Sequence, residues 1–124
     1  MAQLESRLRR LIASPTFSLD QADEAPAGPG VFVLSDSDQV THYYAEACQT
    51  LRIALTNLVK SGRAGTREAS ISLRPGLAEH LGISETKVKD YLRKHCVIRW
   101  VQLDEGASAL AHFAIALLRP VLNE

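Results

Sequence analysis

Basic side chains are concentrated in one stretch of the chain, and their chemistry is that of phosphate recognition. Residues 52–99 carry ten Lys or Arg against four Asp or Glu, whereas residues 11–51 carry six acids and no Lys or Arg. Basic side chains that neutralise phosphates supply much of the affinity for nucleic acids. The alternative is a solvated helix surface, which the formal net charge of zero favours. The candidate nucleic-acid-binding residues are Arg52, Lys60, Arg63, Arg67, Lys87, Lys89, Arg93 and Lys94.

Within this stretch, residues 77–94 (LAEHLGISETKVKDYLRK) have the spacing of a helix-turn-helix that reads DNA. Ala78 is followed four residues later by Gly82, and Val88 and Leu92 supply the packing face of a second helix. In such motifs the second helix lies in the major groove. The alternative is two short helices that only pack under a sheet, because residues 69–75 do not read as a third supporting helix. The polar residues free to read bases would be Ser84, Glu85, Thr86, Lys87, Lys89 and Asp90.

Histidine and cysteine side chains do not form a recognisable metal motif in this sequence. The four histidines lie too far apart for a zinc motif, the two cysteines lack CxxC spacing and no phosphate-binding glycine loop is present, so we expect no cofactor. The residues concerned are His42, His80, His95, His112, Cys48 and Cys96. The N-terminus lacks an apolar signal segment and no apolar run is long enough to span a membrane. These features predict a cytoplasmic protein with free thiols and no membrane contact.

The elements that must position these side chains follow from hydrophobic spacing and from Gly and Pro. Helical spacing predicts helices over residues 2–13, 47–60 and 84–94, with a short helix between Pro75 and Gly82 and a last apolar helix that stops near Pro120. Residues 30–34 and 40–44 read as a hairpin, and residues 97–103 as a third strand. The order predicts an α/β domain of the α+β type, a three-stranded antiparallel sheet with flanking helices. We expect one domain, residues 15–124, preceded by an N-terminal helix within residues 1–14.

Several short motifs occur in an order that points to a known family. They are PGVF at 29–32, HYYAEA at 42–47, a helix beginning Leu51-Arg52, VIRWVQL at 97–103 and RPVLN at 119–123. Together they resemble the GIY-YIG nuclease superfamily over roughly residues 27–123. The resemblance implies a fold that cuts phosphodiesters with a tyrosine, an arginine, and a glutamate that holds one divalent cation. Those parts serve as water activator, phosphate clamp and metal ligand.

Matched residue by residue, the resemblance implies that the catalytic set is missing. The first tyrosine position holds Phe32, the arginine position holds Ala54, and the glutamate position holds Ala111. The second motif keeps a tyrosine, either Tyr43 or Tyr44, depending on whether one extra residue is allowed before the helix. Its glycine is replaced by Ala45 or Glu46, whereas Pro120 and Asn123 of the last motif are intact; these changes predict a catalytically inactive relative that acts as a nucleic-acid-binding or interaction module.

Three alternatives remain open from the sequence. One is an active nuclease, dependent on Mg2+ or Mn2+, that uses Tyr43 or Tyr44 together with Arg52 and His112 in shifted roles. Another is a helix-turn-helix DNA-binding protein. The third is a homodimer or a protein-interaction module, because the last helix is apolar nearly all round and such a helix is either central or covered.

Overall fold

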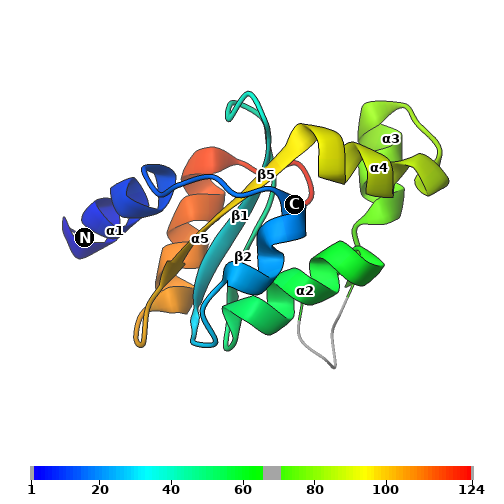
Figure 1. Cartoon of the computed structure of the whole chain (residues 1–124). Coiled ribbons are helices and arrows are strands. Elements are labelled where there is room, and N and C mark those ends of the chain that lie inside the picture. The colour runs from blue at the N-terminus through cyan, green and yellow to red at the C-terminus, as the bar shows by residue number, and fades with distance from the viewer. Residues whose placement is uncertain (1, 66–70, 124) are drawn as a thin grey trace.

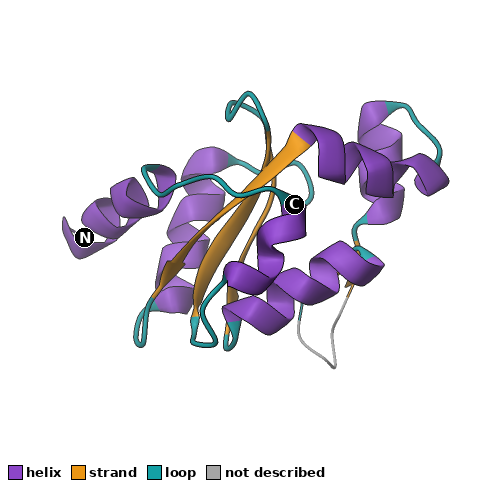
Figure 2. Ribbon diagram, viewed as in Figure 1, coloured by secondary structure: helices purple, strands orange, loops and turns teal. Residues whose placement is uncertain are grey.

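The computed structural model describes residues 2–65 and 71–123. Residues 2–65 form α1 (Ala2–Ile12), the short 3-10 helix η1 (Leu19–Glu24), β1 (Gly30–Asp36), β2 (His42–Cys48), α2 (Leu51–Ser61) and β3 (Arg63–Ala64). Residues 71–123 form β4 (Ile71–Ser72), α3 (Arg74–Leu81), α4 (Glu85–His95), β5 (Cys96–Gln102) and α5 (Ala107–Leu118). Helices and strands thus alternate along the described chain, with β1 and β2 adjacent, β3 and β4 between α2 and α3, and β5 between α4 and α5 (Figures 1 and 2).

The main sheet has three antiparallel strands in the order β2-β1-β5, which confirms the predicted fold class. Helices α1 and α5 cover one face, and η1 and α2 cover the other, as Figure 1 shows. Helices α3 and α4 lie at one end of the sheet, where α4 leads directly into β5. Strands β3 and β4 form a separate two-stranded ladder beyond α2.

The alternation of side chains along β1 divides the core between the two faces. Phe32 and Leu34 are buried with α2, α3 and α4 in one cluster, whereas Val31 and Val33 are buried with α1 and α5 in the other. Neighbouring residues of a strand point to opposite faces, so the central strand contributes to both clusters. Each fully buried aliphatic or aromatic side chain stabilises the fold by about 1.5–3 kcal/mol.

The second strand lies further along the chain than the sequence predicts. We expect a strand over residues 40–44 and a helix from residue 47, but β2 runs from His42 to Cys48 and α2 begins at Leu51. The reason is tertiary: Glu46 and Ala47 pair with Phe32 and Val31 of β1, which holds these weak strand formers extended.

The short helix and the following helix form as the sequence predicts. Helix α3 ends at Gly82, which adopts a left-handed conformation with φ +68°, and its N–H donates to the carbonyl of Ala78. The Ile83 N–H donates to the same carbonyl at 3.1 Å, so the turn is closed before α4 begins. Left-handed backbone at a helix C-terminus favours glycine.

The N-terminal helix packs onto the domain. Leu8 and Leu11 of α1 are buried in the same cluster as Leu110 and Ala114 of α5. Among the described residues, no helix is long and apolar enough to cross a membrane.

Candidate functional site

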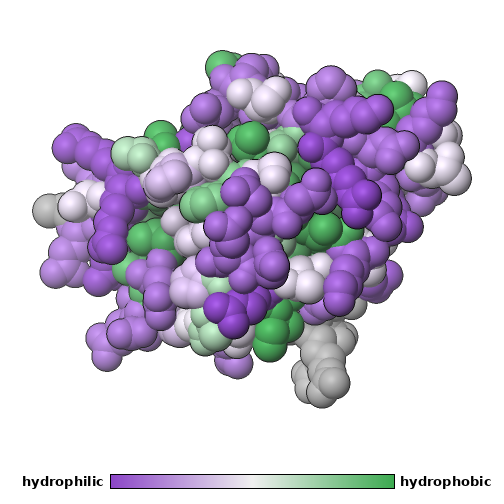
Figure 3. All heavy atoms as spheres, viewed as in Figure 1, coloured by the Kyte–Doolittle hydropathy of each residue, from purple (hydrophilic) through white to green (hydrophobic). Residues whose placement is uncertain are grey.

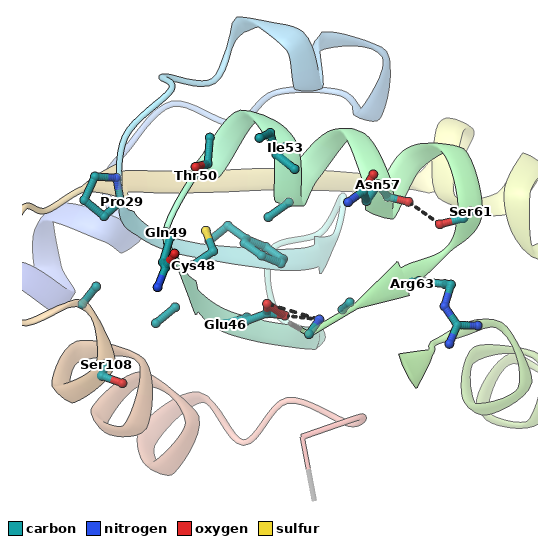
Figure 4. A pocket seen from close by; sticks show the side chains of 16 residues that line it. Pro29, Glu46, Cys48, Gln49, Thr50, Ile53, Asn57, Ser61, Arg63 and Ser108 are labelled. Atoms are coloured by element: carbon teal, nitrogen blue, oxygen red, sulfur yellow. Dashed lines mark hydrogen bonds between the residues drawn. The ribbon is translucent and has the colours of Figure 1, made fainter. Parts of the chain in front are cut away.

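A groove of about 1170 Å3 opens between α2, the end of β2, β3 and the first turn of α5 (Figure 4). Among the described residues, its walls combine apolar side chains with amides, hydroxyls, one carboxylate and one guanidinium. The lining residues that carry the argument are Phe32, Glu46, Ala47, Ala54, Asn57 and Arg63.

Two of the three positions that the sequence resemblance singles out, Phe32, Ala54 and Ala111, line this groove. Phe32 lies at its floor, only 1% exposed, and Ala54 faces it from α2. Neither side chain has a group that activates water or binds phosphate. Ala111 on α5 does not line the groove. It is buried in the second core cluster, with residues of α1 and β1.

The register of β2 separates the two neighbouring tyrosines. Tyr44 pairs with Leu34, on the same face as Phe32, and the two aromatic rings lie 6.2 Å apart. Tyr43 is the extra residue at a register shift between Leu34 and Ser35, so it projects toward α4. Its hydroxyl donates to Asp36.

Neither tyrosine is suited to act as a base. Burial raises the pKa of Tyr43, and its hydrogen bonds to Tyr91 and Asp36 raise it further. Burial also raises the pKa of Tyr44, as does the neighbouring charge of Glu46. Both phenols therefore hold their protons at neutral pH.

Glu46 contributes a carboxylate to the lining of the groove, and sequence matching missed it. Its Oε2 accepts a hydrogen bond from the Gly65 N–H at 2.8 Å and one from the Tyr44 hydroxyl at 3.1 Å. Burial raises the pKa of Glu46, although these two hydrogen bonds act in the opposite direction. From the sequence, Glu46 counted only as a departure from a glycine. The signal that could have found it is an acid set between two alanines in a strand.

The residues of the shifted nuclease do not come together. Tyr43 lies at the start of β2, whereas Arg52 lies beyond its other end, in the first turn of α2, where its Nε donates to the Ala25 carbonyl at 2.9 Å. His112 is exposed on α5, and neither it nor Arg52 lines the groove. The shifted site that the sequence analysis describes, built from Tyr43 or Tyr44 with Arg52 and His112, therefore draws its residues from different elements, β2, α2 and α5.

The candidate basic residues fall into separate groups. Lys60 and Arg93 line a small cavity of about 240 Å3 together with Asp20 and Asp23, and Arg93 forms an ion pair with Asp20 at 3.6 Å. Arg63 lines the large groove, Arg52 lies at the start of α2, and Arg67 falls outside the described residues. The remaining three lie on α4: Lys87, Lys89 and Lys94.

Helix α4 presents a continuous polar surface. Val88 and Leu92 are buried beneath it, Tyr91 is half-buried, and every other residue from Glu85 to His95 is exposed. Within the described part of the chain, no acidic side chain forms an ion pair with Lys87 or Lys89. In Figure 1, α3 and α4 cross one another at the end of the molecule furthest from α1. On the face that Figure 3 shows, most side chains at that end are hydrophilic.

The cysteines and acids offer no metal centre in the part of the chain that the structure covers. No group of three His, Cys, Asp or Glu side chains among residues 2–65 and 71–123 is placed to hold an ion. Cys48 and Cys96 are free, and burial raises the pKa of each thiol to about 12. Both thiols are therefore protonated and poor nucleophiles at neutral pH.

Comparisons with known proteins do not assign a family. No protein-family model matches the chain, and no match was found among curated proteins or among solved structures.

Proposed function

We propose that this chain is a nucleic-acid-binding module that contacts duplex DNA through α3 and α4 and does not hydrolyse it. The observation that carries the proposal is the exposed polar surface of α4, which follows α3 through a tight turn at Gly82. A second helix exposed in this way can enter a major groove, about 12 Å wide. Helix α4 carries four basic and two acidic side chains.

Different positions on α4 serve packing, base contact and phosphate contact. Val88 and Leu92 hold the helix to the body of the protein. Thr86 and Asp90 lie on the side of the helix opposite them, because residues spaced by four share one face. Lys87 and Lys89 lie on either side of Thr86 and Asp90. From there each lysine can reach the phosphates beside the groove. Phosphate contacts of this kind fix the position of the protein on the duplex, so that Thr86 and Asp90 face the bases.

The composition of the groove supports binding without hydrolysis. Phe32 and Ala54 stand where the resemblance to GIY-YIG nucleases implies a tyrosine and an arginine. Glu46 adds a carboxylate beside them, and a carboxylate repels a phosphate. Loss of a single charge-stabilising group costs an enzyme about 10²–10³ in rate, and here several are replaced together.

The test is a fluorescence-anisotropy titration of labelled duplex DNA at low and moderate salt, with and without Mn2+, followed by a gel. Three or four phosphate contacts predict that log K falls with log salt with a slope of about −3 to −4. We expect intact DNA in the gel under all conditions. An absence of binding at low salt would reject the proposal, and Mn2+-dependent cleavage that His112→Ala abolishes would restore the nuclease alternative.

Self-association is a second candidate, favoured by one observation on α5. Leu110, Ala111 and Ala114 are buried against the sheet, yet Leu117 is 58% exposed and Ala116 is exposed beside it. A second copy of the chain would cover this patch. A molar mass by light scattering that does not change with concentration and equals one chain of 13.6 kDa would remove this candidate.

A further inference from the structure

The large groove contains a carboxylate that lacks a cationic partner among the described residues. The donors to Glu46 in the described part of the chain are neutral: the Gly65 N–H and the Tyr44 hydroxyl. Arg63 lines the same groove, but it forms no ion pair with Glu46, and in Figure 4 its guanidinium points away from that carboxylate. A carboxylate has about four acceptor sites, so Glu46 keeps capacity for further donors.

The groove also exposes part of a sheet edge. The C-terminal segment covers the first part of the outer edge of β2: the Val121 and Leu122 N–H groups donate to the carbonyls of His42 and Tyr43. The side chain of Asn123 then pairs with both backbone groups of Ala45.

Ala47 is the next residue of β2 whose backbone faces outward. Alternate residues of an antiparallel strand direct their N–H and C=O to the same edge, so Ala47 presents these groups as Ala45 does. Among the described residues, no backbone group outside the sheet bonds to Ala47, and Ala47 lines the groove. A free stretch of edge invites an added strand.

The rest of the lining suits an extended peptide. Gln49, Asn57 and Ser108 supply amide and hydroxyl groups that can bond to a peptide backbone, and the side chain of Ile53 is 60% exposed at the rim. The volume of about 1170 Å3 exceeds the 300–1000 Å3 that pockets for small ligands typically have.

We propose that this groove binds an extended segment of a partner protein, which pairs with the edge of β2 at Ala47 and places an Arg or Lys side chain against Glu46. Strand addition supplies main-chain hydrogen bonds, and side-chain pockets supply specificity. Arginine is favoured over lysine because its planar guanidinium donates two parallel hydrogen bonds to one carboxylate. The site is separate from α4, so it goes beyond the DNA-binding function.

The affinity of the groove for a basic peptide should depend on pH. Among the described residues, the titratable groups that face Glu46 are Tyr44 and Cys48 on β2, while Arg63 on β3 lines the same groove with its guanidinium directed away. Burial raises the pKa of the phenol and of the thiol, so both are neutral below pH 8. Burial also raises the pKa of Glu46. A basic peptide binds its ionised form, so affinity increases as pH rises through that pKa and Glu46 releases its proton.

The test is a titration of the 15N-labelled full chain with the peptide Ac-Ala-Ala-Arg-Ala-Ala-NH2, followed by NMR. We expect shifts of the amides of Ala47, Cys48 and Gly65, and affinity about tenfold weaker when Gln replaces Arg in the peptide. The variant Glu46→Gln should weaken binding equally, whereas the charge-matched control Glu105→Gln, on an exposed loop residue, should not.

Two further ligands separate the contribution of strand pairing from that of the contact with Glu46. Methylation of the peptide nitrogens removes the donors that strand addition needs, and should weaken binding about tenfold even if Glu46→Gln fails to fold. Ethylguanidinium alone should shift Gly65 but not Ala47. Binding that is indifferent to both the arginine and the methylation, or shifts located only on α4, would overturn the proposal whatever the result with DNA.

Discussion

The Tyr91 hydroxyl donates a 2.7 Å hydrogen bond to Oδ2 of Asp36, and so joins the middle of α4 to the end of β1. The Tyr43 hydroxyl donates to the same oxygen at 2.8 Å. Helix α4 is therefore attached to the sheet by a polar contact as well as by the buried side chains of Val88 and Leu92. This attachment holds in place the surface that we propose for DNA.

Loss of the Tyr91 hydroxyl should loosen this attachment. The variant Tyr91→Phe keeps the ring and removes one donor to Asp36, so we expect the free energy of unfolding to fall by about 1 kcal/mol, a modest value because both groups contact solvent. Urea denaturation followed by circular dichroism measures it. A midpoint identical to that of the parent chain would show that this hydrogen bond does not support the fold.

The same contact predicts a dependence of stability on pH. Burial alone would raise the pKa of Asp36, but the hydrogen bonds from Tyr91 and Tyr43 outweigh it and hold the pKa below its ordinary value of 3.8. A depressed pKa in the folded state means that the stabilisation is present above pH 3.8 and is lost as pH falls below it. The difference in unfolding free energy between the parent chain and Asp36→Asn should therefore shrink between pH 6 and pH 3. A constant difference over that range would contradict the assignment.

The sequence was sufficient for α3 and α4 because their signals are local. Ala78, Gly82 and Val88 are spaced as two packed helices and a tight turn require, and the structure has this arrangement. The fold class followed for the same reason, since three strands and the helices between them were each visible as hydrophobic patterns.

The groove could not be predicted because its parts depend on long-range pairing. The alternation of β2 beyond Tyr44 is set by its ladder with β1, not by the strand propensity of Ala45, Glu46 and Ala47. The register shift beside Ser35, which separates the roles of Tyr43 and Tyr44, has no local signal. The position of Gly65 against Glu46 likewise joins residues far apart in the chain.

The turn between α3 and α4 allows a clean test of backbone strain. A Cβ at Gly82 would meet no atom within 4 Å, so only the φ of +68° resists a side chain there. We expect Gly82→Ala to lower the free energy of unfolding by about 1 kcal/mol, and Gly82→Asn by less, because asparagine tolerates the left-handed region. Thermal denaturation of the two variants compares them. An alanine variant as stable as the parent would mean that the turn relaxes to another conformation.

The guanidinium of Arg99 should contribute less to stability than its burial suggests. Arg99 is only 2% exposed, and burial lowers its pKa. It donates to the Ile12 carbonyl and to Ser35, while its Nε finds no partner among the described residues. Replacement of a buried charge by an apolar side chain of similar size is often neutral.

We therefore expect Arg99→Met to change the free energy of unfolding by less than about 1 kcal/mol. The variant Arg99→Ala should cost about 3 kcal/mol, because it also leaves a cavity. Denaturant unfolding of both variants separates the two contributions. Equal losses in the two variants would show that the charge itself stabilises the fold.

The most direct measurement of the central claim compares two double variants in the salt dependence of duplex DNA binding. Lys87→Ala/Lys89→Ala removes two charges from α4, and Arg9→Ala/Arg10→Ala removes two exposed charges from α1, at the other end of the molecule. We expect the slope of log K against log salt to become less steep by about 2 in the α4 variant, because two phosphate contacts are lost. The α1 variant should keep the slope of the parent chain. Equal losses in both variants, or no loss in the α4 variant, would contradict it.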